Sequence, residues 1–87
     1  MAQVIFSGSL KAIIGTERLT VAGKTLQEIV TNMISKEKKF EELLKKDPNL
    51  MEINIFINGV PVTESDLSKI PVNEKDELLF MLPISGG

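Results

Sequence analysis

The chain ends in Phe80-Met81-Leu82-Pro83-Ile84-Ser85-Gly86-Gly87. An apolar, strand-like run stops at Pro83, which cannot donate to a sheet ladder and so marks where strand pairing ends. Gly86 and Gly87 have no Cβ, so a narrow channel would meet little more than backbone there. Many chain ends simply fray, but a strand that leads into such a tail suggests a working terminus. We expect residues 1–82 to form one domain and residues 83–87 to form a flexible tail.

The strand that precedes the tail is apolar on both of its faces. Leu78, Phe80 and Leu82 fall on one face, and Leu79 and Met81 fall on the other. This pattern is typical of a central strand that is covered on both sides. The sequence, however, has only enough helix to cover one face of a small sheet. Either a loop covers the second face, or part of it is an exposed apolar patch that a partner covers.

Two short strands and a capped helix are predicted in the first part of the chain. Residues 4–6 and 18–21 have strand composition and can pair as a hairpin around Gly15, while residues 10–14 form either a helical turn or a continuation of the first strand. Thr25 and Glu28 form a capping box. The apolar stripe that follows at helical spacing consists of Leu26, Ile29, Val30, Met33 and Ile34. Residues 35–47 are highly charged and extend this helix or form a second one.

The second part of the chain reads as a hairpin, a polar connection and a last strand. Ile53, Ile55 and Ile57 alternate with Asn54, Phe56 and Asn58, as in a strand, and Asn58-Gly59 is a strong hairpin signal. Pro61 indicates a short return at the edge of the sheet. Residues 63–73 are a polar connection, and the last strand covers residues 77–82. Runs of strands with one covering helix indicate an α+β domain.

Composition excludes several classes of function. With ten Lys+Arg against twelve Asp+Glu and a net charge of -2, there is no basic excess to attract nucleic acid or an anionic membrane. The chain has no cysteine and no histidine, so a Ser-His triad and thiolate chemistry are excluded. We expect no metal site, no permanently bound cofactor and no catalysis by the chain alone. No signal peptide is evident, so we expect a cytoplasmic protein.

In its arrangement, size and ending, the chain resembles the ubiquitin-like β-grasp sulfur carriers, and most of all the MoaD family, the small subunits of molybdopterin synthase. Leu82 departs from that family by standing where a first proline is common. The resemblance implies a mixed sheet of about four to five strands with one main helix packed on one face. It rests on Phe6, Leu10, Gly15, Thr25, Leu26, Asn58, Gly59, Asp76, Glu77, Phe80, Pro83, Ile84, Ser85, Gly86 and Gly87.

The resemblance also implies a chemistry for the terminus. An E1-like, MoeB-like enzyme would use MgATP to adenylate the carboxylate of Gly87, and a sulfur donor would then convert it to a thiocarboxylate. A MoaE-like large subunit would transfer that sulfur to a pterin precursor. The residues implied to bind these partners are Phe80, Met81, Pro83, Ile84, Ser85 and Gly86, although a core position is the preferred interpretation for the side chain of Phe80.

Other functions fit the same terminus. A ubiquitin-like modifier would join Gly87 to lysines of other proteins. A carrier for thiamine synthesis would use the same thiocarboxylate. An interaction domain with an incidental Gly-Gly ending would use neither. The sequence alone leaves these alternatives open.

Overall fold

The computed structural model describes residues 1–46 and 53–82, and for residues 43–46 it describes the backbone alone. The expected tail, residues 83–87, lies outside the described residues. The chain is an α+β domain, as predicted. Its elements are β1 (Ala2–Ser7), α1 (Ser9–Ile14), β2 (Arg18–Val21), α2 (Leu26–Lys36), α3 (Lys38–Lys46), β3 (Asn54–Ile57), β4 (Val60–Pro61), the 3-10 helix η2 (Leu67–Lys69) and β5 (Glu77–Met81).

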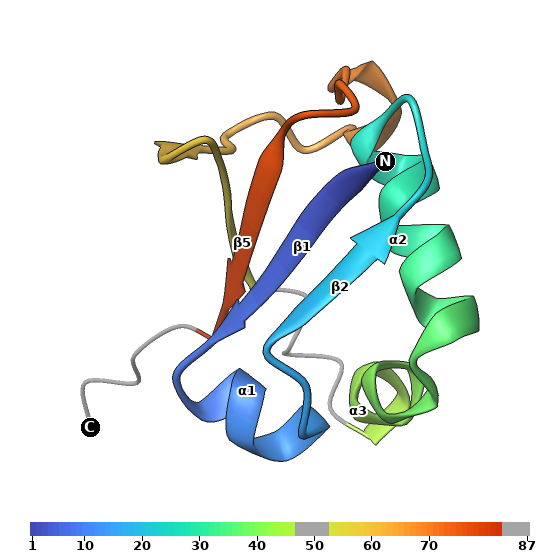
Figure 1. The fold of residues 1–87 in the computed structure, drawn as a ribbon, viewed down its shortest axis with the longest axis vertical. Coiled ribbons are helices and arrows are strands. Elements are labelled where there is room, and N and C mark those ends of the chain that lie inside the picture. Colours follow the sequence, from blue (N-terminus) through green and yellow to red (C-terminus); the bar gives the residue numbers. More distant parts are fainter. Residues whose placement is uncertain (47–52, 83–87) are drawn as a thin grey trace.

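The described strands form one mixed sheet of five strands in the order β2-β1-β5-β3-β4 (Figure 1). β5 is the central strand, as its two apolar faces indicated. It runs parallel to β1, with Ile5 opposite Leu79, and antiparallel to β3, with Phe56 opposite Leu79. The remaining pairs, β1 with β2 and β3 with β4, are antiparallel. The first and last strands of the chain therefore lie side by side in the middle of the sheet.

The helices and one face of the sheet enclose the core. At its centre the rings of Phe6, Phe40 and Phe80 meet with centroids 6.0 to 6.2 Å apart, and two of the three pairs are edge to face, an arrangement that aromatic quadrupoles favour. Each ring comes from a different element, namely β1, α3 and β5. The buried residues around them are Ala2, Val4, Leu10, Ile14, Val21, Leu26, Ile29, Met33, Val72 and Leu78.

Residues 9–14 form the helix α1, which decides between the two alternatives for this segment. α1 ends at Gly15, whose φ of 79° is left-handed and whose N–H donates to the carbonyl of Lys11, a geometry that glycine adopts without strain. β1 and β2 pair antiparallel as expected, but a helix rather than a tight turn joins them. Leu10 and Ile14 on α1 are buried and close one end of the core.

α2 begins at the predicted cap. The N–H of Glu28 donates to Oγ1 of Thr25 over 3.2 Å, and Oε1 of Glu28 accepts from the N–H of Lys24 over 3.1 Å, one residue before the position that a capping box uses. Glu37 is extended (φ -124°, ψ 97°) and ends α2. The charged segment is therefore a second helix, α3, and its Phe40 is 2% exposed.

The hairpin between β3 and β4 is the one that Asn58-Gly59 predicts. Both residues have positive φ, 51° and 83°, as a type I′ turn requires. Ile57 pairs with Val60 across the turn. β4 is an edge strand of the sheet, so Pro61 lies where a missing N–H is tolerated.

Candidate functional site

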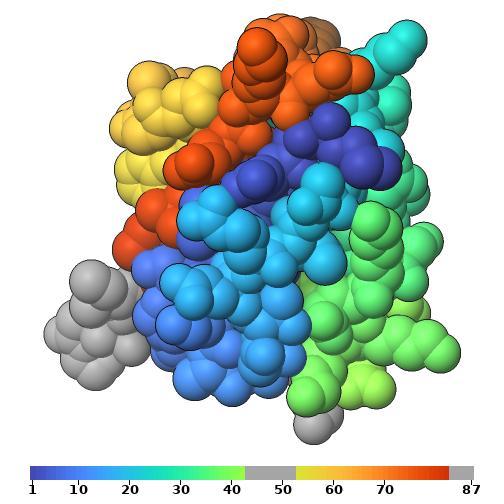
Figure 2. All heavy atoms as spheres, in the orientation of Figure 1, coloured from blue at the N-terminus to red at the C-terminus, as the bar shows by residue number. Residues whose placement is uncertain are grey.

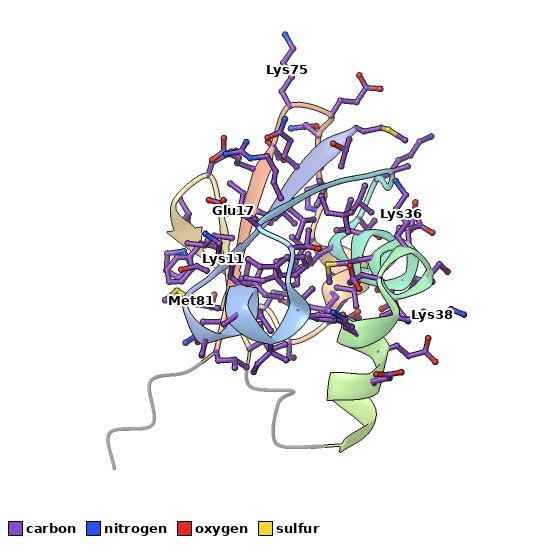
Figure 3. The ribbon with its side chains drawn as sticks, turned by 60° about the horizontal axis from the view of Figure 1, so that its bottom comes forward. Lys11, Glu17, Lys36, Lys38, Lys75 and Met81 are labelled. Atoms are coloured by element: carbon purple, nitrogen blue, oxygen red, sulfur yellow. The ribbon has the colours of Figure 1, made fainter. Side chains whose placement is uncertain are left out.

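The two faces of β5 differ in how far their side chains are buried. Leu78 and Phe80 are buried, at 0% and 1% exposure, whereas Leu79 and Met81 are only half-buried. By strand alternation Leu79 and Met81 lie on the face opposite Leu78 and Phe80, and Figure 3 shows Met81 well away from α2 and α3. Of the two alternatives for the second face, the described residues show the partly exposed apolar patch. We call Ile5, Phe56, Leu79 and Met81 the open-face patch.

The open-face patch lines an open hollow of ≈ 580 Å³ on the sheet. Its residues come from β1, β3 and β5, and Leu79 lies directly between Ile5 and Phe56 in the sheet register. In Figure 2 the strands β5, β1 and β2 lie side by side at the surface (red, dark blue and light blue). The rest of the hollow is polar and is lined by Asn58, Gly59, Lys75 and Glu77.

A network of hydrogen bonds fixes this polar rim. The backbone N–H of Asn58 donates to the carbonyl of Glu77 over 2.8 Å, and the N–H of Glu77 returns a bond to Oδ1 of Asn58 over 3.0 Å. Asp76 accepts from the backbone N–H of Asn73 over 2.8 Å and from Nδ2 of Asn58 over 2.9 Å. The bond from Asn73, followed by that from Asn58, lowers the pKa of Asp76, because both donors stabilise the charged carboxylate. The β3–β4 turn is thereby tied to the start of β5.

The sites predicted from sequence fall into three groups. Met81 is on the open face, next to the point where the described chain ends. The side chain of Phe80 is in the core, as the preferred interpretation held, so it supports the sheet from behind and does not reach the open face. The other predicted residues, Pro83, Ile84, Ser85, Gly86 and Gly87, lie outside the described residues, and their roles stay predictions.

Sequence reasoning did not single out Ile5 and Phe56 as part of the patch. The signal was present, since Ile5 alternates with Val4 and Phe6, which face the core. Phe56 alternates in the same way with Ile55 and Ile57. Both positions became interpretable only once β1 and β3 were known to flank β5.

Residues 1–46 and 53–82 contain no group of three or more His, Cys, Asp or Glu placed to hold a metal ion. Among the same residues, no buried side-chain N or O atom lacks a hydrogen-bond partner. No helix in this part of the chain is long and apolar enough to cross a membrane.

Solved structures share this fold over nearly their whole length. The small archaeal modifier protein 1 of Methanosarcina acetivorans superimposes with a TM-score of 0.78 and 22% identity, over 99% of this chain and 95% of that one. A chain of the BexX/CysO complex of Amycolatopsis orientalis gives a TM-score of 0.76 and 24% identity, over 100% of this chain and 100% of that one. A chain of the complex of subunits 1 and 2 of molybdopterin-converting factor from Helicobacter pylori gives a TM-score of 0.66 and 19% identity, over 99% of this chain and 97% of that one. No curated protein matches the sequence.

A family comparison goes further than the fold. The model of the ThiS family matches residues 4–87, from β1 through Gly86 and Gly87. The likeness to solved structures independently supports a ubiquitin-like β-grasp fold, and the resemblance seen in the sequence is confirmed at this level. The chain belongs to the ThiS family and has the fold of its ubiquitin-like sulfur carriers.

Proposed function

We propose that this protein is a sulfur carrier whose C-terminal carboxylate, on Gly87, is adenylated by an E1-like enzyme and converted to a thiocarboxylate. The observation that carries the proposal is the family match, because it continues through Gly86 and Gly87. The absence of cysteine and histidine from the whole sequence is consistent with this assignment. Such a chain lacks both a thiol nucleophile and histidine, the commonest general base.

The chemistry accounts for the need for a partner. A carboxylate is a poor electrophile because its negative charge is delocalised over both oxygens. Attack of the Gly87 carboxylate on the α-phosphate of ATP releases pyrophosphate and gives an acyl-adenylate. Sulfide supplied by a sulfur donor then attacks the acyl carbon, AMP leaves, and a thiocarboxylate remains. The activating enzyme supplies the Mg²⁺ and the phosphate-binding groups, and this chain supplies the terminus and a surface that positions it.

The open-face patch is the surface that we assign to this docking. Residues 82–87 span at most about 20 Å when fully extended. An enzyme that binds Leu79 and Met81 is therefore within reach of the Gly87 carboxylate. Lys75 and Glu77 on the rim of the hollow carry opposite charges and set the orientation of a partner rather than its affinity.

For the final acceptor we propose molybdenum or tungsten cofactor synthesis, with a MoaE-like large subunit as the second partner. This assignment rests on the ending Phe80-Met81-Leu82-Pro83-Ile84-Ser85-Gly86-Gly87. The second candidate is a protein modifier, because the same activated glycine can acylate a lysine amine and because a structural neighbour bears the name modifier. A carrier for thiamine synthesis is a further alternative. All of these roles place the chain in the cytoplasm with its activating enzyme and MgATP.

The deciding experiment uses the missing cysteines. The chain is co-expressed with its E1-like enzyme and treated with iodoacetamide, and the intact and fragment masses are measured. Because the chain has no cysteine, an adduct at Gly87 identifies a thiocarboxylate. The intact mass alone is insufficient, since exchange of oxygen for sulfur gives nearly the same shift as oxidation of one of its four methionines. A chain that lacks Gly87 is the matched control.

Each outcome has a separate meaning. An adduct at Gly87 supports the carrier, and sulfur transfer to a pterin precursor by the large subunit then tests the acceptor. Gly87 joined to lysines of other proteins, in bonds that resist thiols, supports the modifier. If an enzyme shown to be active produces neither product, the proposal is wrong and the chain is an interaction domain.

A further inference from the structure

The outer edge of β2 has two of its outward carbonyls occupied by side chains. β2 is the first strand in the sheet and has β1 on one side only. The N–H of Phe6 donates to the carbonyl of Glu17 over 2.8 Å, which fixes the phase of the antiparallel ladder. Since bonded pairs alternate in such a ladder, Leu19 and Val21 point their backbone groups toward β1. Arg18 and Thr20 therefore point theirs outward.

Two side chains of α2 donate hydrogen bonds to carbonyls of this outward row. Nζ of Lys36 donates to the carbonyl of Thr20 over 2.7 Å. Nδ2 of Asn32 donates to the carbonyl of Ala22, also over 2.7 Å. The two donors are four residues apart, so they lie on one side of α2. They occupy successive outward acceptors of β2 and its continuation, where a neighbouring strand would otherwise bond.

The other edge of the sheet is closed by a different device. Val62 donates its N–H to the carbonyl of Ile55, so Pro61 is the β4 residue that faces outward. Proline has no N–H, so β4 presents no outward donor and cannot be opened by a change of side chains elsewhere. The β2 edge keeps its backbone donors, and side chains of α2 cover two of its acceptors, the carbonyls of Thr20 and Ala22. It is therefore the edge that can be opened.

We propose that the outer edge of β2 is a strand-pairing surface for a second copy of this chain, and that Asn32 and Lys36 hold it closed. The edge is self-complementary. In a two-fold antiparallel pairing centred on Thr20, Thr20 faces its own copy and Arg18 faces Ala22, so each pair exchanges both backbone bonds. No like charges stand directly opposite each other in this register.

Lys36 opposes this pairing in two ways. Its ammonium occupies the carbonyl of Thr20, which would lie at the two-fold axis. The same position brings the Lys36 ammoniums of both copies close together, and like charges there repel. Lysines that guard an exposed edge are a general means of preventing sheet extension. Here the guard comes from α2, outside the strand that it protects, and its removal leaves β2 itself unchanged.

The test replaces the two guards and measures self-association. Lys36→Met keeps the helix propensity and the aliphatic stem, and Asn32→Ala removes the second donor. We expect the double variant to dimerise, with a molar mass twice the 9.6 kDa of the chain, by light scattering and sedimentation equilibrium. The backbone amides of Thr20 and Ala22 should exchange hydrogen more slowly in the double variant than in the parent chain. Lys38→Met is the matched control, because it removes the same charge from an exposed side chain that points away from the molecule (Figure 3).

Three results would overturn the inference. One is a double variant that is folded and stays monomeric at millimolar concentration. Another is a parent chain that already pairs through β2, because Asn32 and Lys36 would then not hold this edge closed. The third is a dimer that survives Thr20→Pro, which removes the central outward N–H at an edge position where proline is tolerated. None of these readouts involves Gly87, so failure here leaves the proposed sulfur chemistry untouched.

Discussion

Asp76 shows how one carboxylate holds two distant segments together. It accepts from Asn73 in its own turn and from Asn58 in the β3–β4 hairpin, 18 residues away. Asn58 in turn pairs with Glu77 at the start of β5. The rim of the open hollow is therefore set by side chains that are all polar and largely exposed. Their contribution depends on the charge of Asp76, which makes it testable by pH.

The first prediction is that Asp76 contributes stability that acid removes. The pKa of Asp76 is lowered in the folded chain, so folding favours the ionised carboxylate. The stabilisation is fully present above the pKa of the unfolded chain, about 3.9, and is lost as the pH falls through the lowered folded pKa. We expect Asp76→Asn to cost about 0.5–1 kcal/mol at pH 7, and less at low pH, by urea unfolding over a pH series.

Glu74 supplies the matched control for Asp76. It is exposed in the same turn, and no hydrogen bond ties it to Asn58 or Asn73, so Glu74→Gln removes a charge without touching the network. Its stability should follow that of the parent chain at every pH. Equal acid dependence of the parent chain and Asp76→Asn would contradict the role assigned to Asp76.

Among the elements, α2 is the one whose start the sequence predicts best. Thr25 caps it through the N–H of Glu28, and Thr25→Ala should cost about 1 kcal/mol of folding free energy. The matched control is Thr31→Ala, since Thr31 is exposed inside the same helix and makes no cap. Denaturant midpoints at a constant m-value measure both effects. A loss as large for Thr31→Ala would show that the effect is not one of capping.

The open face of the sheet leads to a prediction about docking. Leu79→Thr introduces a β-branched residue that is compatible with a strand and places a hydroxyl between Ile5 and Phe56. We expect about a tenfold loss in adenylation efficiency with the E1-like enzyme, because about 1–2 kcal/mol of apolar burial in the complex is lost. Val60→Thr is the control, since Val60 is 64% exposed on β4 and lies outside the patch. Equal losses for both variants, or none for Leu79→Thr, would remove the patch from the docking surface.

Local signals predicted these elements, and long-range contacts decided what the sequence left open. The Thr25 cap and the Asn58-Gly59 turn act within a few residues, and both are found in the structure. The separation of α3 from α2 depends on the extended backbone of Glu37, which follows from packing Phe40 against Phe6 and Phe80. The faces of β5 could not be told apart before its neighbours were known. The terminal Gly-Gly was evident in the sequence, but Ile5 and Phe56 beside Leu79 were not.

At the scale of the whole molecule, the face of the sheet that stabilises the fold is not the face that is open to a partner. One face carries the core that the helices cover (Figure 1), and the other carries the open-face patch. Of the two edges, β4 presents Pro61 and β2 is covered by Asn32 and Lys36. Partner binding in the proposed function is thus directed to one face, on the strand that leads to the terminus.

Because the core and the terminus are separate, we predict that each can be altered without the other. Every buried residue of the described core falls between Ala2 and Phe80, so deletion of Gly86 and Gly87 should change the free energy of unfolding by less than about 0.5 kcal/mol. The same deletion should abolish thiocarboxylate formation, because the reacting carboxylate is displaced by two residues. Phe80→Ala should have the opposite effects. It should lower the free energy of unfolding by about 3–5 kcal/mol, because it leaves a cavity beside Phe6 and Phe40, but the chain that remains folded should still form the thiocarboxylate because its terminus is intact. Urea unfolding and alkylation at Gly87, measured on both variants at a temperature where Phe80→Ala is still folded, separate the two effects. A deleted chain that unfolds more easily would mean that the terminus contributes to the fold, and a folded Phe80→Ala chain that is not activated would mean that the core also shapes the docking surface.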